Sequence, residues 1–207
     1  MFEQVLSGNT KTVLASLENN RIIQKAYLAG GTALALQLGH RVSYDLDFFT
    51  LEEFDEQMLL PEIKEMPNFQ LEKIAWRTIL GKIKDVKFSM FYYKYFLLYP
   101  TKKFRGIKIA DVRDIAAMKI AAIASRGTKR DFVDLYFISK EKLSLKEVFR
   151  LYDKKFKNFD SMKMHIMKSL IYFDDAESDE MPRMLKEADW KGIKKYFENE
   201  VRRRVIG

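Results

Sequence analysis

Apolar and polar positions alternate differently in the two halves of this chain of 207 residues. In the first half, short apolar segments separated by polar ones are typical of strands and short helices, and residues 70–80 and 86–98 are rich in β-branched and aromatic residues. In the second half, apolar positions recur at helical spacing. The pattern predicts an α/β (α+β) fold, with a mixed β-sheet in residues 1–110 and a mainly helical part in residues 111–207.

Helix-capping and turn-forming residues predict where the individual helices and strands begin and end. Residues 1–25 predict a helix or helix pair, residues 26–28 a strand, and residues 32–38 a short helix that Gly39 ends. Residues 81–85 suit a turn, and residues 104–109 predict another strand. Further helices are predicted at 58–63, from 111 to about 125, from 128 to about 138, at 145–152, at 162–172 and from 190 to about 203, with an acidic loop at 174–180.

Asp45 and Asp47 form the pattern with the most informative chemistry. In an extended strand successive side chains alternate faces, so both carboxylates point the same way while Leu46 and Phe48 point into the core. Two like charges held side by side are costly unless a cation lies between them. Mg²⁺, which prefers oxygen ligands, is the natural candidate, and the sequence therefore predicts a magnesium site at Asp45 and Asp47.

A Gly30-Gly31 pair precedes this strand. Glycines let the backbone approach a triphosphate closely, and the helix that follows presents unpaired N–H groups to phosphate. Thr32 or Ser43 could add a hydroxyl contact, although both are equally suited to be turn or cap residues. Strand, Gly-Gly turn, short helix and a strand with Asp-x-Asp form the arrangement that a nucleotidyltransferase needs, with one metal ion bridging the triphosphate oxygens.

Composition and charge limit the partners and the types of site that this chain can have. The formal net charge of +8 and the pI near 9.4 favour an anionic partner such as nucleic acid, nucleotide or an acidic protein, although a surface kept soluble by lysine has the same composition. The absence of cysteine excludes disulfides and zinc-thiolate sites. No signal peptide or bilayer-spanning apolar run is visible, so we expect a cytoplasmic protein with no membrane contact.

Three segments of the chain carry a further signal: Leu28–Leu36 with Gly39–Phe49, Asp114–Ile120 with Ser125–Tyr136, and Ser169–Glu177 with Pro182 and Trp190. They resemble the AbiEii-type nucleotidyltransferase toxin family, a distant branch of the polymerase-β-like nucleotidyltransferases. The similarity spans nearly the whole chain, from about residue 25 to about residue 200. The resemblance implies Mg²⁺-dependent transfer of a nucleotide from an NTP, in several relatives onto the 3′ end of tRNA. It also implies a toxin of an AbiE-like toxin–antitoxin or phage-defence system, held in check by an antitoxin protein.

The second segment supplies the remaining candidate residues. Helical spacing directs Lys119 and Arg126 to one side of their helix, and two cations on a shared face suit a triphosphate. The family resemblance implies a catalytic role for Lys119 and Asp131, with Asp131 either positioning Lys119 or Arg130 or deprotonating the acceptor hydroxyl. We therefore expect Asp45, Asp47, Lys119 and Asp131 to be catalytic. Substrate contacts are expected from Gly30, Gly31, Thr32, Ser43, Arg126 and Arg130, with the helical part completing the active-site cleft.

One departure from the wider superfamily keeps a second hypothesis open. Polymerase-β-like transferases usually add a third carboxylate from a neighbouring strand, whereas the candidate strand here, Val86–Phe91, contains no acid. The alternative is a catalytically silent protein that keeps the fold and binds RNA or a partner protein. Nucleotide transfer onto a small molecule is a third possibility that the sequence leaves open.

Overall fold

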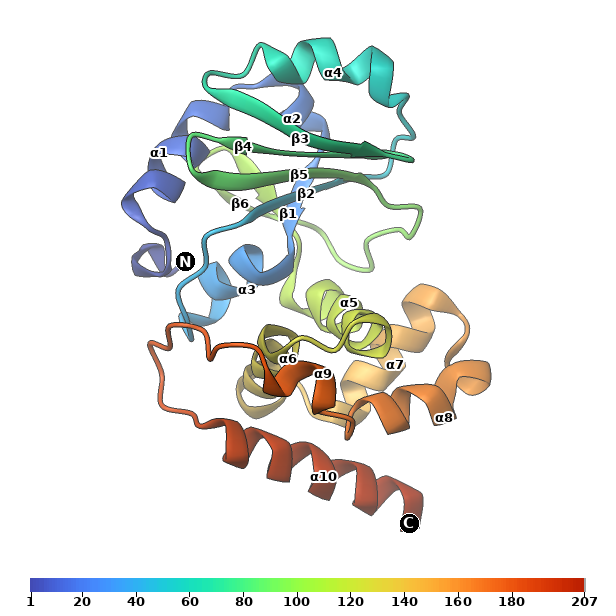
Figure 1. Ribbon diagram of the computed structural model, residues 1–207. Helices are drawn as coiled ribbons and strands as arrows, with labels where there is room; N and C mark the ends of the chain where they lie inside the picture. The colour runs from blue at the N-terminus through green and yellow to red at the C-terminus, as the bar shows by residue number, and fades with distance from the viewer. Residues whose placement is uncertain (207) are drawn as a thin grey trace. The chain divides into compact units, whose positions relative to one another are not determined.

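The computed structural model describes residues 1–206 and divides at Asp111 into two compact units (Figure 1). The first unit, residues 1–111, is built on a sheet, and the second, from residue 112 onward, is helical. None of the described helices is long and apolar enough to span a membrane. The mixed α/β fold class that the pattern predicted is confirmed.

The first unit contains one mixed sheet with the strand order β3-β4-β5-β2-β1-β7-β6. Strands β1 and β7 pair in parallel, as do β2 and β5, and the other neighbours are antiparallel. The bounds are β1 (Tyr27–Ala29), β2 (Leu46–Thr50), β3 (Phe69–Ala75), β4 (Thr78–Ile83), β5 (Val86–Tyr92), β6 (Lys102–Phe104) and β7 (Ile107–Ile109).

Short helices cover this sheet, and in Figure 1 α3 and α4 lie on opposite sides of it. Helix α3 begins directly at the end of β1 and ends at Gly39, which has a left-handed backbone with φ of 67°, as its predicted role of C-cap requires. The bounds are η1 (Glu3–Val5), α1 (Gly8–Leu17), α2 (Arg21–Lys25), α3 (Gly30–Leu38) and α4 (Glu56–Lys64).

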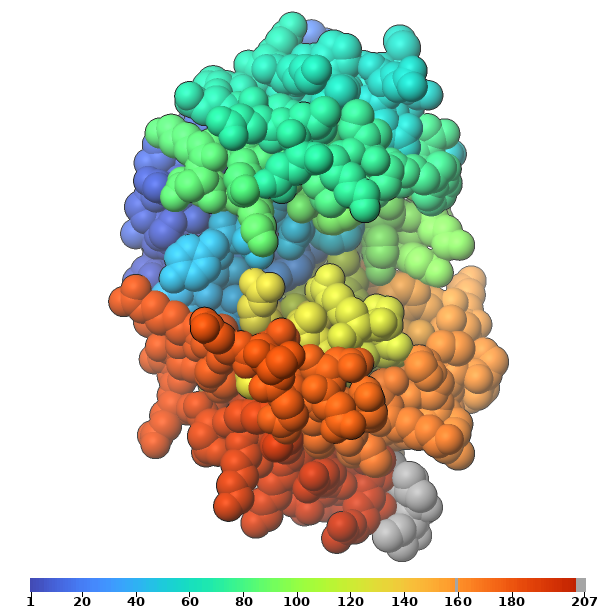
Figure 2. Space-filling view, in the orientation of Figure 1, coloured from blue at the N-terminus to red at the C-terminus, as the bar shows by residue number. Residues whose placement is uncertain are grey.

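In the second unit α6, α7 and α8 pack against α5, and α10 packs against α6. A cluster of aromatic rings forms part of its core, where Phe132 contacts Phe173, Trp190 and Phe197 at centroid distances of 5.2, 5.8 and 5.6 Å. Figure 2 shows the segment from α8 to α10, orange to red, exposed over a broad area. The bounds are α5 (Val112–Ser125), α6 (Lys129–Glu141), α7 (Leu145–Phe156), α8 (Phe159–Ser169), α9 (Asp174–Glu177) and α10 (Trp190–Ile206).

Several predicted boundaries were wrong. Residues 70–80 do not form one strand, because the chain reverses at Trp76 and Arg77 between β3 and β4. Residues 104–109 likewise contain a reversal at Arg105 and Gly106, both with positive φ, so β6 and β7 form a hairpin. The short helix begins at Gly30 rather than Thr32, β5 ends at Tyr92, and the acidic segment opens with α9.

Gly81 also lies elsewhere than predicted, inside β4 and not in a turn. A Cβ at this position would overlap the carbonyl oxygen of Gln70 and would lie 2.6 Å from Cε2 of Phe69. The ring of Phe69 therefore occupies the space that a side chain at residue 81 would need. Glycine is used here for close packing between β3 and β4.

Replacing Gly81 by alanine should consequently destabilise the protein. We expect Gly81→Ala to lower the free energy of unfolding by about 1–3 kcal/mol, the usual cost of overpacking, as measured by urea denaturation followed by circular dichroism. Gly8→Ala is the matched control, because a Cβ at Gly8 meets nothing within 4 Å. Equal stability of the two variants would contradict this account of Gly81.

Candidate active site

The first cluster of candidate residues surrounds the start of α3. Strand β1 pairs with β2 so that Ala29 lies opposite Asp47, and Gly30 follows directly as the first residue of α3. A Cβ on Gly30 would lie 3.0 Å from Oδ2 of Asp47. The Asp47 carboxylate therefore lies against the N-terminal end of α3, where the helix dipole stabilises negative charge.

Arg41 belongs to the same cluster and was not predicted. Its side chain is almost fully buried, with 3% of its surface exposed, and a Cβ on Gly31 would overlap its guanidinium. The same Cβ would lie 3.5 Å from Oγ of Ser43. The missing side chain of Gly31 thus makes room for a buried cation beside the first turn of α3, which is a second reason for the Gly-Gly pair.

Thr32 and Ser43 form the inner wall of this cluster. Their hydroxyl oxygens are 2.8 Å apart, and the Thr32 hydroxyl also donates to the carbonyl oxygen of Asp45. Both side chains are buried, and the Ser43 backbone N–H donates to the carbonyl oxygen of Val5 at 2.9 Å. These bonds hold the loop before β2 against α3, so the structure shows a positioning role for both hydroxyls. Their contact with a phosphate stays a prediction.

Asp45 and Asp47 follow the predicted alternation. Leu46 and Phe48 are fully buried, whereas Asp45 and Asp47 are half-buried. Two carboxylates suit Mg²⁺, which is usually held by one or two protein carboxylates together with water and substrate phosphates. No group of three or more His, Cys, Asp or Glu residues that could hold a metal occurs among the described residues. The donor set therefore fits an ion that is shared with a phosphate ligand.

The strand next to Asp47 supplies no third acid. Strands β2 and β5 pair in parallel with Asp47 opposite Ser89, and the neighbouring residues that point to the same face are Lys87 and Phe91. The sheet register thus agrees with the sequence in giving this position a hydroxyl in place of a carboxylate.

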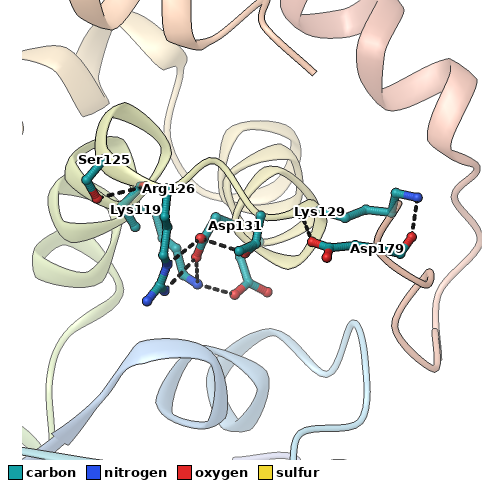
Figure 3. A network of polar contacts seen from close by, with 9 residues as sticks. Lys119, Ser125, Arg126, Lys129, Asp131 and Asp179 are labelled. Carbon is teal, nitrogen blue, oxygen red and sulfur yellow. Dashed lines mark hydrogen bonds and ion pairs between the residues drawn. The ribbon is translucent and has the colours of Figure 1, made fainter. Parts of the chain in front are cut away.

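The second cluster lies in the helical unit, where α5 meets α6 (Figure 3). The Lys119 ammonium is 2.9 Å from Oδ1 of Asp131 and 2.6 Å from Oδ2 of Asp134. Arg126 donates through Nε to Oδ2 of Asp131 at 3.0 Å, and Thr128 lies 2.7 Å from the same oxygen. The structure therefore brings Lys119, Arg126 and Asp131 together, as helical spacing predicted for the two cations.

Burial and charge act in opposite directions on Asp131. Burial alone would raise the pKa of its carboxyl, but the charges of Lys119 and Arg126 and their hydrogen bonds hold the pKa well below its usual range. Asp131 is therefore a stable anion. A carboxylate of such low basicity is poorly suited to take a proton from a hydroxyl, which favours the positioning role for Asp131 over the deprotonating one.

Asp134, Arg126 and Arg130 differ in how far they are exposed. Asp134 is fully buried against Lys119 and lies one helical turn after Asp131, a spacing that could have indicated a shared partner. Arg126 has 64% of its side chain exposed, so it can contact a ligand while it holds Asp131. Arg130 is exposed in the first turn of α6.

Comparison with known proteins gives consistent matches. The family model described as nucleotidyl transferase AbiEii toxin, type IV TA system, matches residues 12–103 and 66–204. An uncharacterised protein of Aquifex aeolicus (strain VF5) is 40% identical over 202 residues, covering 95% of this chain and 96% of its own.

Two solved structures share the fold. The nucleotidyltransferase toxin MenT4 of Mycobacterium tuberculosis H37Rv is 17% identical with a TM-score of 0.60, over 93% of this chain and 78% of its own. JHP933 of Helicobacter pylori is 20% identical with a TM-score of 0.54, over 97% of this chain and 89% of its own.

The low pKa of Asp131 makes stability depend on pH. Because the folded pKa lies below the unfolded value of about 3.9, the unfolded chain binds more protons once the pH falls below about 4, and the stability that the ionised carboxylate contributes is lost. We expect wild-type protein to lose about 1 kcal/mol more unfolding free energy than Asp131→Asn between pH 5 and pH 3. Urea denaturation at each pH measures the difference.

The matched control is Asp160→Asn, which removes an exposed carboxylate of α8. This variant should follow the pH dependence of the wild type. Parallel curves for wild type and Asp131→Asn would show that Asp131 is not held as a stabilised anion.

Proposed function

Since this chain belongs to the AbiEii nucleotidyltransferase toxin family, we propose that it transfers a nucleotide from an NTP to a hydroxyl at the 3′ end of an RNA acceptor, with tRNA as the first candidate. We further propose that it is the toxin of an AbiE-like toxin–antitoxin or phage-defence system and that an antitoxin protein restrains it. The family description supports a toxin with an antitoxin partner. The RNA acceptor is supported by the basic composition.

The observation that carries this proposal is the Asp47 carboxylate beside the N-terminal end of α3, together with Asp45, whose backbone carbonyl oxygen accepts a hydrogen bond from Thr32 of that helix. Asp45 and Asp47 would hold Mg²⁺, and Gly30 and Gly31 let Asp47 and Arg41 lie against the first turn of α3. When bound, Mg²⁺ neutralises charge on the triphosphate. Arg41 adds a fixed positive charge next to Gly31, so this small region combines an anion-binding helix end with two metal-binding carboxylates.

The proposed reaction is an in-line displacement at the α-phosphorus. The acceptor hydroxyl oxygen forms a bond to the α-phosphorus and loses its proton to water, the bond from that phosphorus to the bridging oxygen breaks, and pyrophosphate leaves. Most of the catalysis in such a transfer comes from positioning and charge stabilisation. We assign charge stabilisation to Lys119 and Arg126. Asp131 and Asp134 hold the Lys119 ammonium in place from two sides.

The test of this function is nucleotide labelling of RNA. Purified protein, total tRNA, Mg²⁺ and each α-labelled NTP in turn should give labelled RNA, and Asp47→Asn should reduce the initial rate by about 100-fold or more, because it removes a charge needed in the transition state. Glu198→Gln is the control, because it changes an exposed acid on α10 in the same way. Full labelling by Asp47→Asn with an unchanged circular dichroism spectrum would exclude the mechanism.

Ser89 opposite Asp47 favours a second candidate function, a catalytically silent protein that binds RNA or a partner protein. Ligand binding to the folded state separates the two candidates, because it raises the midpoint of thermal unfolding. For the transferase we expect an NTP with Mg²⁺, at about one hundred times its dissociation constant, to raise the midpoint by about 5 °C. The rise should be absent in Asp47→Asn. A wild-type midpoint that does not respond to any NTP with Mg²⁺ would support the silent protein.

A further inference from the structure

Helix α7 carries a row of basic side chains that the proposed chemistry does not use. Lys146, Arg150 and Lys154 follow one another at intervals of four residues, and Lys157 ends the helix in a left-handed conformation with φ of 55°. All four residues are exposed. Residues spaced by four lie on one side of a helix, so the first three form a line about 12 Å long. We call these four residues the α7 basic row.

The opposite face of α7 is fixed in the core of the unit. Its buried residues include Leu145, Val148 and Tyr152, and Lys155 forms an ion pair of 2.8 Å with Asp114 of α5 in which neither side chain is exposed. Lys155, which points inward, therefore has a partner, and this ion pair also fixes the rotation of α7 about its own axis. The α7 basic row is consequently held on the outer surface by the packing of the whole helix.

Glu147, the acid in the first turn of α7, forms hydrogen bonds at the N-terminal end of the helix. Glu147 accepts hydrogen bonds from the backbone N–H and the hydroxyl of Ser144, each at 2.7 Å, in a capping box. These two bonds lower the pKa of Glu147. The charge of Arg150 lowers this pKa as well, so Glu147 lies near the row, and Asp153 is a second exposed acid of α7. Four basic residues therefore stand against two acids along this surface, which leaves a positive excess.

Like charges four residues apart destabilise a helix, by about 0.2–0.5 kcal/mol for each pair. Lysines near the C-terminal end are compensated by the helix dipole, whereas Lys146 lies in the first turn, where the dipole is unfavourable for a cation. The whole helical unit has 22 Lys and Arg against 16 Asp and Glu, a net charge of +6, whereas the sheet unit has 15 against 13, a net charge of +2. The basic excess of the chain therefore lies mainly on the unit that contains α7.

The chemistry of this surface distinguishes nucleic acid from protein as the partner. Protein interfaces have an apolar core and are depleted in lysine. No large hydrophobic residue of α7 is exposed, although such residues occur elsewhere in the described part of the chain, for example Met164 of α8. Lysine and arginine in a regular line, with no apolar centre, match a chain of phosphates, which carries evenly spaced negative charge.

We propose that the α7 basic row is the docking surface for the phosphate backbone of the RNA acceptor. This inference rests on the proposed function for its choice of RNA, but it concerns a surface that lies outside the metal-binding and triphosphate-binding residues. Contacts of this kind fix the orientation of an RNA and carry no sequence information. The row would therefore hold many RNAs equally, and selection of the acceptor must come from other residues.

The test compares two triple variants of the full chain with a synthetic RNA hairpin that has a single-stranded 3′ tail. Lys146→Gln/Arg150→Gln/Lys154→Gln removes three charges of the row, and the matched control Lys64→Gln/Lys73→Gln/Lys103→Gln removes three exposed charges of the sheet unit. Fluorescence anisotropy gives the affinity at several salt concentrations. The slope of log affinity against log salt should fall by about 2–3 in the row variant, or about 0.7–0.9 per lost contact, and stay unchanged in the control.

An equal change of slope in both triple variants would show a diffuse charge effect and would overturn the proposal. An unchanged slope in the row variant would also overturn it, and would leave an acidic protein as the partner of this helix. The result is separable from the proposed function, because the midpoint shift with NTP and Mg²⁺ does not depend on RNA. If the row variant keeps that shift and loses RNA binding, the inference is supported; if the wild type lacks the shift but binds RNA through the row, only the transferase proposal fails.

Discussion

The fold of this protein depends on charged side chains that are buried away from water and therefore need partners of opposite charge. In the helical unit Lys119 lies between Asp131 and Asp134, and Lys155 lies against Asp114 with neither side chain exposed. An unpaired buried charge costs several kcal/mol, so α5, α6 and α7 must pack in the arrangement that brings these groups together. The same pairs that restrict the fold therefore also hold the Lys119 side chain rigidly.

A related constraint shapes the start of α3. Two side chains of opposite charge approach the first turn of this helix, Asp47 at Gly30 and Arg41 at Gly31. Each approach occupies the volume that a Cβ would take, so the glycines are needed for the charges as well as for the turn. The carboxylate gains from the helix dipole, and the guanidinium gives the same small region a positive charge. This packing therefore places charges of both signs close together at the start of α3.

The elements that were predicted correctly are those with a strong local signal. Strand alternation alone was enough to predict that Leu46 and Phe48 are buried, whereas Asp45 and Asp47 are only half-buried. The reversal at Trp76 and Arg77 was missed because neither residue is a turn former, although Arg77 has a φ of 50°. The hairpin at Arg105 was missed although Gly106 supplied the usual signal.

Buried charge is the part of the candidate site that the sequence could not reveal. Arg41 and Asp134 look like ordinary polar residues, and their burial depends on Gly31 and on Lys119, which are ten and fifteen residues away. Helical spacing did predict that Lys119 and Arg126 share a face, since that relation is local. Long-range contacts decide which of the many charged residues are enclosed, and no periodic pattern contains that information.

The distribution of charge separates the inside of the helical unit from its surface. Among the side chains that the structure describes, its buried cations are Lys119, Lys129 and Lys155, and its buried acids are Asp114, Asp131 and Asp134. The interior is therefore balanced, and the basic excess lies outside the core. Balanced interior charge contributes to stability and positioning, whereas surface charge acts on partners over about 8–10 Å at physiological salt. The two roles can thus change independently of each other.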